Sequence, residues 1–177
     1  MKNIFFLLFI TGVLTACHQG RTYEDFIEVP DPWNSEKVIR FNVNITDTAD
    51  AQNVYLSVRN TSKYGFSNLY LFVTAHSPNG AAVRDTVEIT LADEHGKWLG
   101  KGAASVFTLY HPYKMHIRFP LRGIYTFDVE QAMWVTDLSG LTDIGLKIEK
   151  ETLRINSCFP WRRKSCSALQ KWKDFQM

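Results

Sequence analysis

The chain has 177 residues, of which 45% are hydrophobic and 14% aromatic, with 20 basic and 18 acidic side chains. This is enough apolar material for the core of one domain, and it excludes an intrinsically disordered chain. The net charge of +2 is unevenly placed, because residues 151–177 alone carry six basic and two acidic side chains. The remainder lacks the basic field that drives binding to nucleic acid, so we expect no nucleic-acid partner.

The first sixteen residues have the pattern of an export signal. Lys2 supplies a positive charge, and residues 4–14 form an apolar run interrupted only by Thr11 and Gly12. At 1.5 Å per residue, a helix of about eleven residues is too short to span ~30 Å of hydrocarbon. The pattern therefore predicts a signal peptide over residues 1–16, and not a membrane-spanning anchor.

The segment Leu14-Thr15-Ala16-Cys17 follows this run and resembles the lipobox of bacterial lipoproteins. The resemblance implies cleavage before Cys17 and acylation of Cys17, palmitate included, which would tether the protein to a membrane. Several acyl chains hold a protein on a bilayer, whereas one chain binds only marginally. Residue 18 is His and not Asp, the usual inner-membrane retention signal, which favours the outer membrane of the cell envelope. A secreted protein with a chance cysteine at this position is the alternative.

The rest of the chain divides into three segments. We interpret residues 17–32 as a polar tether, 33–150 as the folded domain and 151–177 as a basic tail that we expect to be poorly ordered. Cys158 and Cys166 lie in the tail, where an oxidising envelope would let them form a disulfide. The composition changes abruptly at the tail, which indicates either a frameshifted end or a basic segment that touches anionic lipid headgroups.

Short runs of alternating apolar and polar residues dominate the domain. They predict strands at 39–45, 53–59, 67–75, 84–91, 97–99, 107–110, 114–119, 124–129 and 144–148. Turn residues separate these runs, and Asn79-Gly80 is a strong hairpin signal. Only residues 128–135, where the alternation is interrupted, are compatible with a helical turn. The count and spacing predict a mainly β fold, a single antiparallel β-sandwich of jelly-roll or immunoglobulin-like type.

The sequence contains no nucleophile elbow, zinc-protease motif, phosphate-binding loop or dinucleotide fingerprint. His111 and His116 are five residues apart and would face opposite sides of a strand, so we expect no metal site and no cofactor. Asp128 and Glu130 share a strand face at about 6–7 Å, a spacing that glycoside hydrolysis could use. A solvated strand face has the same pattern, and we predict a protein that is not an enzyme.

Aromatic side chains are the best candidates for a binding surface. Stacking on sugar rings, as in jelly-roll carbohydrate-binding modules, could use Trp33, Trp98, Trp134, Tyr110, Tyr113 and Tyr125. Trp98 lies beside a turn and Trp134 near a break in the alternation, which would leave both exposed. We take Trp98, Trp134 and Tyr113 as candidate binding residues, with the filling of a two-layer core as the alternative role.

The second half of the domain combines several short motifs. Residues 123–127 read Gly-x-Tyr-x-Phe, 131–133 read Gln-Ala-Met, 138–141 read Leu-Ser-Gly-Leu, and 143–150 read Asp-Ile-Gly-Leu-Lys-Ile-Glu-Lys. With the Gly96-x-Trp98-x-Gly100-x-Gly102 turn and the lipobox, this combination resembles the gliding motility lipoproteins called GldH, over residues 1–150. The chain departs from the family pattern at Trp134, where Arg is usual, and in the tail.

The resemblance implies a lipid-anchored accessory of the gliding and type IX secretion machinery that acts by protein–protein interaction. Its partners would then be the membrane, through the lipid, and other motility or secretion proteins of the envelope. A glycan-binding lipoprotein of the cell envelope is the alternative function. An envelope hydrolase is a third possibility and would require Asp128 and Glu130 in a cleft, one of them with a raised pKa.

Overall fold

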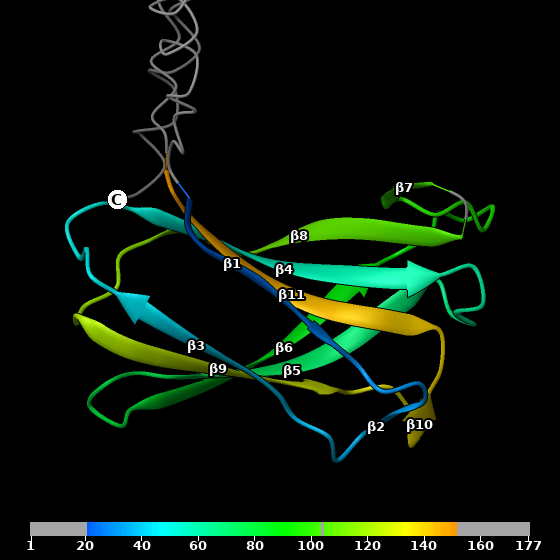
Figure 1. The fold of residues 1–177 in the computed structure, drawn as a ribbon, viewed down its shortest axis with the longest axis horizontal. Helices are drawn as coiled ribbons and strands as arrows, with labels where there is room; N and C mark the ends of the chain where they lie inside the picture. Colours follow the sequence, from blue (N-terminus) through cyan, green and yellow to red (C-terminus); the bar gives the residue numbers. More distant parts are fainter. Residues whose placement is uncertain (1–20, 104, 152–177) are drawn as a thin grey trace, which may run out of the picture.

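A computed structural model describes residues 21–103 and 105–151 of the chain (Figure 1). Within these residues there are eleven strands and no helix, and so no helix that could cross a bilayer. The strands are β1 (Arg21–Glu28), β2 (Trp33–Asn34), β3 (Ile39–Ile45), β4 (Gln52–Thr61), β5 (Asn68–His76), β6 (Ala82–Thr90), β7 (Lys101–Ala103), β8 (Val106–Ile117), β9 (Gly123–Gln131), β10 (Asp137–Leu138) and β11 (Leu141–Lys150).

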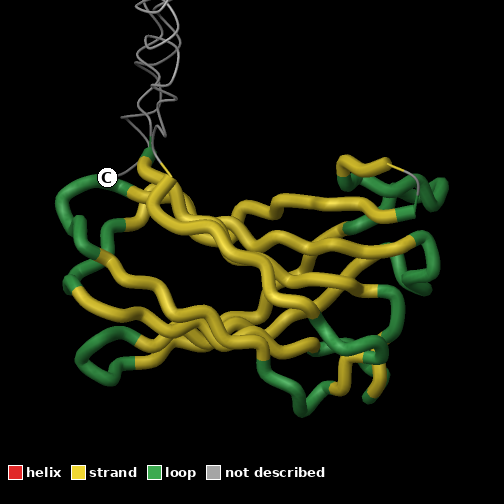
Figure 2. The backbone as a smooth tube through the Cα atoms, in the orientation of Figure 1, coloured by secondary structure: helices red, strands yellow, loops and turns green. Residues whose placement is uncertain are grey.

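The strands form two main antiparallel sheets and one short ribbon. The five-stranded sheet has the order β1-β11-β4-β8-β7, the four-stranded sheet has the order β3-β9-β5-β6, and β10 pairs with β2. The two main sheets face each other as two layers (Figures 1 and 2), which confirms the predicted β-sandwich. Along one side of the sandwich β1 approaches β3. Along the opposite side the edge strands are β6 and β8, with the short β7 covering one end of β8.

The core lies between the two sheets because alternate residues of each strand point inward. In β3, Phe41 and Val43 are buried whereas Arg40 and Asn42 are exposed. The predicted inward positions of β4 and β5 are buried to the same degree, and so are inward residues of β9 and β11. The residues of these four strands with no exposed surface are Val54, Leu56, Val58, Leu69, Leu71, Val73, Val129, Ile144, Leu146 and Ile148.

The prediction of a tether over residues 17–32 was wrong from Arg21 onward. Residues 21–28 form β1, the edge strand that pairs with β11, and Tyr23 and Ile27 pack against the core. On the outer face, Phe26 lies over Gly145, where an added Cβ would approach its ring to 2.7 Å. The polar sequence of this segment suits an edge strand, because an edge strand has to avoid exposing apolar surface. The segment could not be recognised as a strand from its neighbours in sequence, because its partner strand β11 lies more than 100 residues away.

Three smaller predictions also need correction. Residues 97–99 do not form a named strand, because Trp98 makes only an isolated bridge with Ala92. The strands predicted at 107–110 and 114–119 are one strand, β8, whose register with β4 shifts on either side of Val54. The residues predicted to allow a helical turn belong to β9 as far as Gln131 and then to a loop, 132–136. For β8 and β9, pairing with distant strands decided the local structure.

Candidate interaction surfaces

The two ends of the sandwich can be told apart from the strand registers. At one end, here called the proximal end, Arg21 pairs with Glu149, and Gln52 pairs with both Lys150 and Ile117. The β5–β6 hairpin lies at the same end (left in Figure 1). At the other end, here called the distal end, β4, β6 and β9 finish and β5 begins.

The inward-facing residues of β6 become less buried from the distal end to the proximal end. Ile89, near the distal end, has no exposed surface, and Val87 is half-buried. The next two inward positions are Asp85, a charged residue, and Val83, which is 61% exposed. The side of the sandwich between β6 and β8 is therefore closed distally and open proximally.

The distal closure comes from the segment that crosses from β6 to β7. Leu91 begins it and is buried, and the backbone N–H of Leu99 donates to the carbonyl of Leu91. The Trp98 ring then packs against Phe107 at 5.9 Å and against Tyr64 at 6.4 Å between centroids. These contacts seal the distal part of the open side with apolar side chains.

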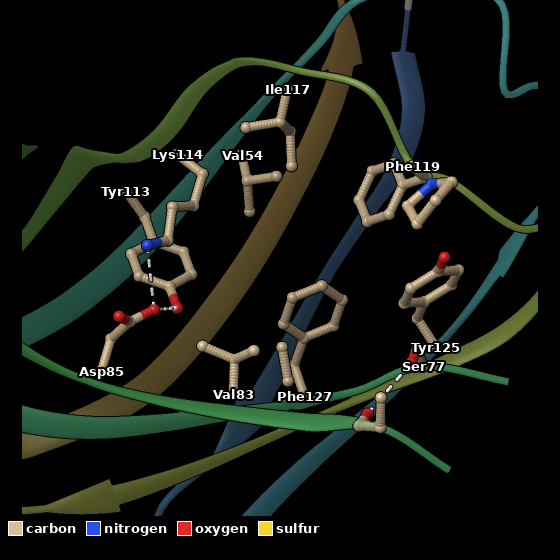
Figure 3. Close-up of a pocket in the computed structure, with 13 residues that line it drawn as sticks. Val54, Ser77, Val83, Asp85, Tyr113, Lys114, Ile117, Phe119, Tyr125 and Phe127 are labelled. Carbon is tan, nitrogen blue, oxygen red and sulfur yellow. Dashed lines mark hydrogen bonds and ion pairs between the residues drawn. The ribbon is translucent and has the colours of Figure 1, made fainter. Parts of the chain in front are cut away.

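The proximal part of the same side holds a pocket of about 320 Å³ between β6 and β8 (Figure 3). Its lining is mostly apolar and comes from both sheets and from the β8–β9 connection. These apolar residues are Val54, Ala75, Ala81, Val83, Ile117, Phe119, Pro120, Tyr125 and Phe127. Of these, Ala81, Val83 and Pro120 are exposed and mark the mouth.

One polar cluster borders the pocket. The Asp85 carboxylate accepts a hydrogen bond of 2.6 Å from the Tyr113 hydroxyl and pairs with the Lys114 ammonium at 3.0 Å (Figure 3). These hydrogen bonds hold the pKa of Asp85 below its ordinary value, and burial raises the pKa of Tyr113. The cluster thus joins the two edge strands, and we call it the Asp85 clasp.

A local irregularity of β8 makes the clasp possible. Val54 pairs with Lys114 and the next residue, Tyr55, pairs with Pro112, so Tyr113 is an extra residue on β8. Such a bulge changes the alternation of side chains along a strand. Tyr113 and Lys114, although adjacent, therefore both line the pocket.

The distal end carries exposed apolar side chains on its loops. Trp134, in the loop after β9, is 102% exposed, and Leu99 is 49% and Phe66 40% exposed. Phe66 extends the ring cluster described above, since its centroid lies 5.8 Å from that of Tyr64. The distal end thus exposes three large apolar side chains on three different connections.

The aromatic residues named from the sequence do not gather on one surface. Trp33 has no exposed surface and its indole N–H donates to the Lys37 carbonyl, so it belongs to the core and not to a sugar-binding platform. Tyr125 is also buried, with its ring 4.9 Å from Phe119. Trp98 is half-buried in the distal closure, Tyr113 is in the clasp, and only Trp134 projects fully into solvent.

The carboxylates considered for hydrolysis lie on the outer face of the four-stranded sheet. Asp128 forms a bidentate pair with Arg40, at 2.7 and 2.8 Å, and Glu130 pairs with Arg84 at 2.7 Å. The hydrogen bond with Arg40 is the main reason that the pKa of Asp128 is lowered, with a smaller contribution from His76. A lowered pKa is the opposite of what a proton donor requires, so Asp128 is unsuited to that role.

Metal binding finds no support in residues 21–103 and 105–151. In that part of the chain no group of three or more His, Cys, Asp and Glu side chains is placed to hold an ion. His76 lies 3.5 Å from Asp128, and His116 lies 2.7 Å from Glu151, so each of these histidines contacts a single carboxylate.

The sequence did not predict a cluster of aromatic side chains on the outer face of the five-stranded sheet. Phe26 and Tyr110 pack edge to face at 6.3 Å, and the Lys147 ammonium lies 5.3 Å from the Tyr55 ring and 5.7 Å from the Tyr110 ring. The interplanar angle of 86° between Phe26 and Tyr110 means that these two rings do not form a flat platform. The signal in the sequence was the outward set of alternating positions, which becomes readable only once β1 is placed beside β11.

Comparison with known proteins assigns the family. The model of the GldH lipoprotein family matches residues 21–148, which begin at β1 and end within β11. The chain belongs to the GldH lipoprotein family. The gliding motility lipoprotein GldH of Flavobacterium johnsoniae is 28% identical over 158 residues, which cover 85% of this chain and 98% of the relative. A GldH homolog of Christiangramia forsetii is 27% identical over 155 residues, covering 84% and 95%.

Membership of the GldH family confirms the resemblance read from the motifs. It identifies the chain as a lipoprotein, which implies a lipid anchor in the cell envelope, and associates it with gliding motility. Cys17, the predicted lipidation site, and the predicted tail beyond residue 151 lie outside the described residues. The family match also covers all the elements that build the pocket and the distal end.

Proposed function

We propose that this GldH-family lipoprotein is a non-enzymatic accessory of the gliding and type IX secretion machinery that binds another envelope protein through its distal end. The observation that carries the proposal is the complete exposure of Trp134, together with the exposure of Leu99 and Phe66 on two other distal loops. Tryptophan is among the residues most enriched at the centres of protein–protein interfaces. Exposed large apolar side chains that gather on one end of a domain mark a contact surface.

The orientation of the domain supports this choice of surface. If Cys17 carries the lipid, three residues lie between it and Arg21 at the proximal end, and the four Cα–Cα steps of extended chain span at most about 14 Å. The proximal end then faces the bilayer and the distal end faces away from it. With His18 after the lipidated cysteine, we place the anchor in the outer membrane.

The test is crosslinking in intact cells, followed by purification of the protein and mass spectrometry of what is attached. We expect motility or secretion proteins to be recovered with the wild-type chain and to be lost from Trp134→Ala. The control is Ile124→Ala, which removes another exposed apolar side chain, 62% exposed, at the proximal end. Recovery of the same partners with both variants would contradict a distal contact. Loss of the partners in Cys17→Ala would make the tether part of the interaction.

A glycan-binding role is the second candidate, because an exposed tryptophan can also stack on a sugar ring. It needs a second ring beside Trp134, and the other tryptophan proposed from the sequence as a binding residue, Trp98, is engaged with Phe107 and Tyr64. Recovery of the lipoprotein without any protein partner, together with Trp134-dependent binding to envelope polysaccharide, would favour this function over the first.

A further inference from the structure

We propose that the pocket between β6 and β8 binds a fatty-acyl chain. This site goes beyond the contact proposed for the distal end, because it opens at the proximal end of the sandwich. Nothing in the protein-interaction hypothesis requires it.

The chemistry of the lining selects an apolar ligand. Each polar side chain of the lining is already engaged within the protein. The Ser77 hydroxyl bonds to Asn79 and Ala81, the Tyr125 hydroxyl accepts from the Leu121 N–H, and Asp85 is held in its clasp. A polar molecule entering the pocket would lose hydrogen bonds to water without replacement, which is costly. An aliphatic chain loses none.

The size of the pocket fits part of one chain and not a whole lipid. Its volume of about 320 Å³ is at the lower end of the range for small-molecule sites, about 300–1,000 Å³. The walls are aromatic and branched aliphatic side chains, among them Val54, Phe119 and Phe127. An apolar cavity of this kind does not hold water well and takes up apolar molecules instead.

The position of the mouth gives the source of the ligand. Val83 and Pro120 open the pocket at the proximal end, the end from which the chain continues to Cys17. Next to Pro120, the connection between β8 and β9 exposes another apolar side chain, that of Leu121. A bilayer at this end would supply acyl chains directly. This placement rests on the proposed anchor at Cys17, whereas binding to the pocket does not.

Charge at the mouth agrees with a lipid as the source. Arg118 and Arg122 flank Pro120 and are both exposed. Basic side chains close to a membrane surface attract anionic headgroups. The mouth therefore combines an apolar entrance with basic flanks, and this pattern matches a lipid whose chain enters while its headgroup stays outside.

The test uses the mature lipidated protein reconstituted in phospholipid vesicles that contain a trace of phospholipid with a photoactivatable diazirine in its acyl chain. After irradiation, mass spectrometry maps the adducts. We expect adducts on peptides that line the pocket, from β6 and from β8 to β9. A parallel sample with diazirine-labelled palmitate as free acid distinguishes a fatty acid from a membrane lipid as the ligand.

Two variants and one control make the test specific. Ala75→Leu fills the pocket from β5 and should reduce the adduct yield about tenfold or more, since each excluded methylene lowers affinity about fourfold. Val83→Asn removes an apolar side chain from the exposed mouth, where folding is not affected, and should cause a smaller reduction. Ala132→Leu enlarges a half-buried alanine at the distal end and should leave the yield unchanged.

Adducts confined to residues outside the pocket, or a yield that neither pocket variant changes, would overturn the proposal. Because the experiment contains no partner protein, its failure leaves the distal contact untouched, and loss of the distal contact in cells leaves the acyl site untouched.

Discussion

The two ends of the open side, between β6 and β8, are built from the same pair of edge strands but are closed in different ways. Distally the inner residue of β6 is Ile89, and the crossing segment with Leu91 and Trp98 covers it. Proximally the inner residues are Asp85 and Val83, and only a polar clasp joins the strands. The apolar closure contributes to the core, whereas the clasp leaves a pocket beside it. A sandwich of this type can therefore concentrate its stability at one end and keep the other end accessible.

We expect the largest effect on stability when one inward residue is truncated at each end of β6 and the two variants are compared. Ile89→Ala removes a fully buried side chain and should lower the free energy of unfolding by about 2–5 kcal/mol. Val83→Ala removes a largely exposed one and should change it by less than about 0.5 kcal/mol. Urea unfolding of the full chain measures both. Similar losses for the two variants would mean that the pocket is closed in solution.

A glycine at the distal end gives the next largest effect. Gly140 has a φ of +90°, and an added Cβ would lie 2.6 Å from the backbone of Tyr64, which supports the ring cluster of the distal closure. Gly140→Ala should therefore destabilise the protein by about 3 kcal/mol. The control is Gly80→Ala in the proximal hairpin, where φ is +86° but nothing lies within 4 Å. Gly80→Ala should lower the free energy of unfolding by about 1 kcal/mol. An equal loss in both variants would show that the close approach to Tyr64 is unimportant.

The clasp should contribute less, and its contribution should depend on pH. Asp85→Asn removes a partly exposed charge pair and should lower the free energy of unfolding by about 1 kcal/mol at neutral pH. The pKa of Asp85 is lowered by folding. Its stabilisation is therefore fully present above the ordinary carboxyl value, about 3.9, and is lost as the pH falls through the lower value of the folded protein. The difference between wild type and variant should disappear in acid, and a difference that persists there would assign the loss to packing.

The smallest effect on stability belongs to the proposed contact residue. Trp134 is fully exposed, so Trp134→Ala should change the free energy of unfolding by less than about 0.5 kcal/mol. This would show that the loss of partners expected in cells comes from the missing contact and not from unfolding. A marked destabilisation would mean that the ring packs on the domain, and the distal surface would then need another test residue.

Individual strands show which features of the fold the sequence predicted. The inward residues of β3, β4 and β5 were predicted correctly because alternation with a period of two is local and survives any arrangement of the strands. β1 was missed because it is a polar edge strand whose hydrogen-bonded partner, β11, is the last strand of the domain in the sequence. The extra residue at Tyr113 was missed because a bulge exists only relative to the partner strand.

The candidate sites show the same limit. Trp33 and Trp134 look alike as sequence positions, yet pairing of Trp33 with Leu138 buries one ring, while a loop of five residues leaves the other in solvent. The lipobox and the family motifs could be read directly, because they are short and continuous. The pocket could not, because its walls come from five separate stretches of chain.

The sequence by itself determined the β class, the inward faces of β3, β4 and β5 and the resemblance to the GldH family, and it predicts the lipidation of Cys17. The tertiary structure decided which strands are edges, which aromatic rings are buried and where the sandwich stays open. The physical reason is the range of the interactions. Alternation and turn chemistry act over a few residues, whereas sheet pairing joins residues as far apart as Arg21 and Glu149, and the burial of each ring depends on that pairing.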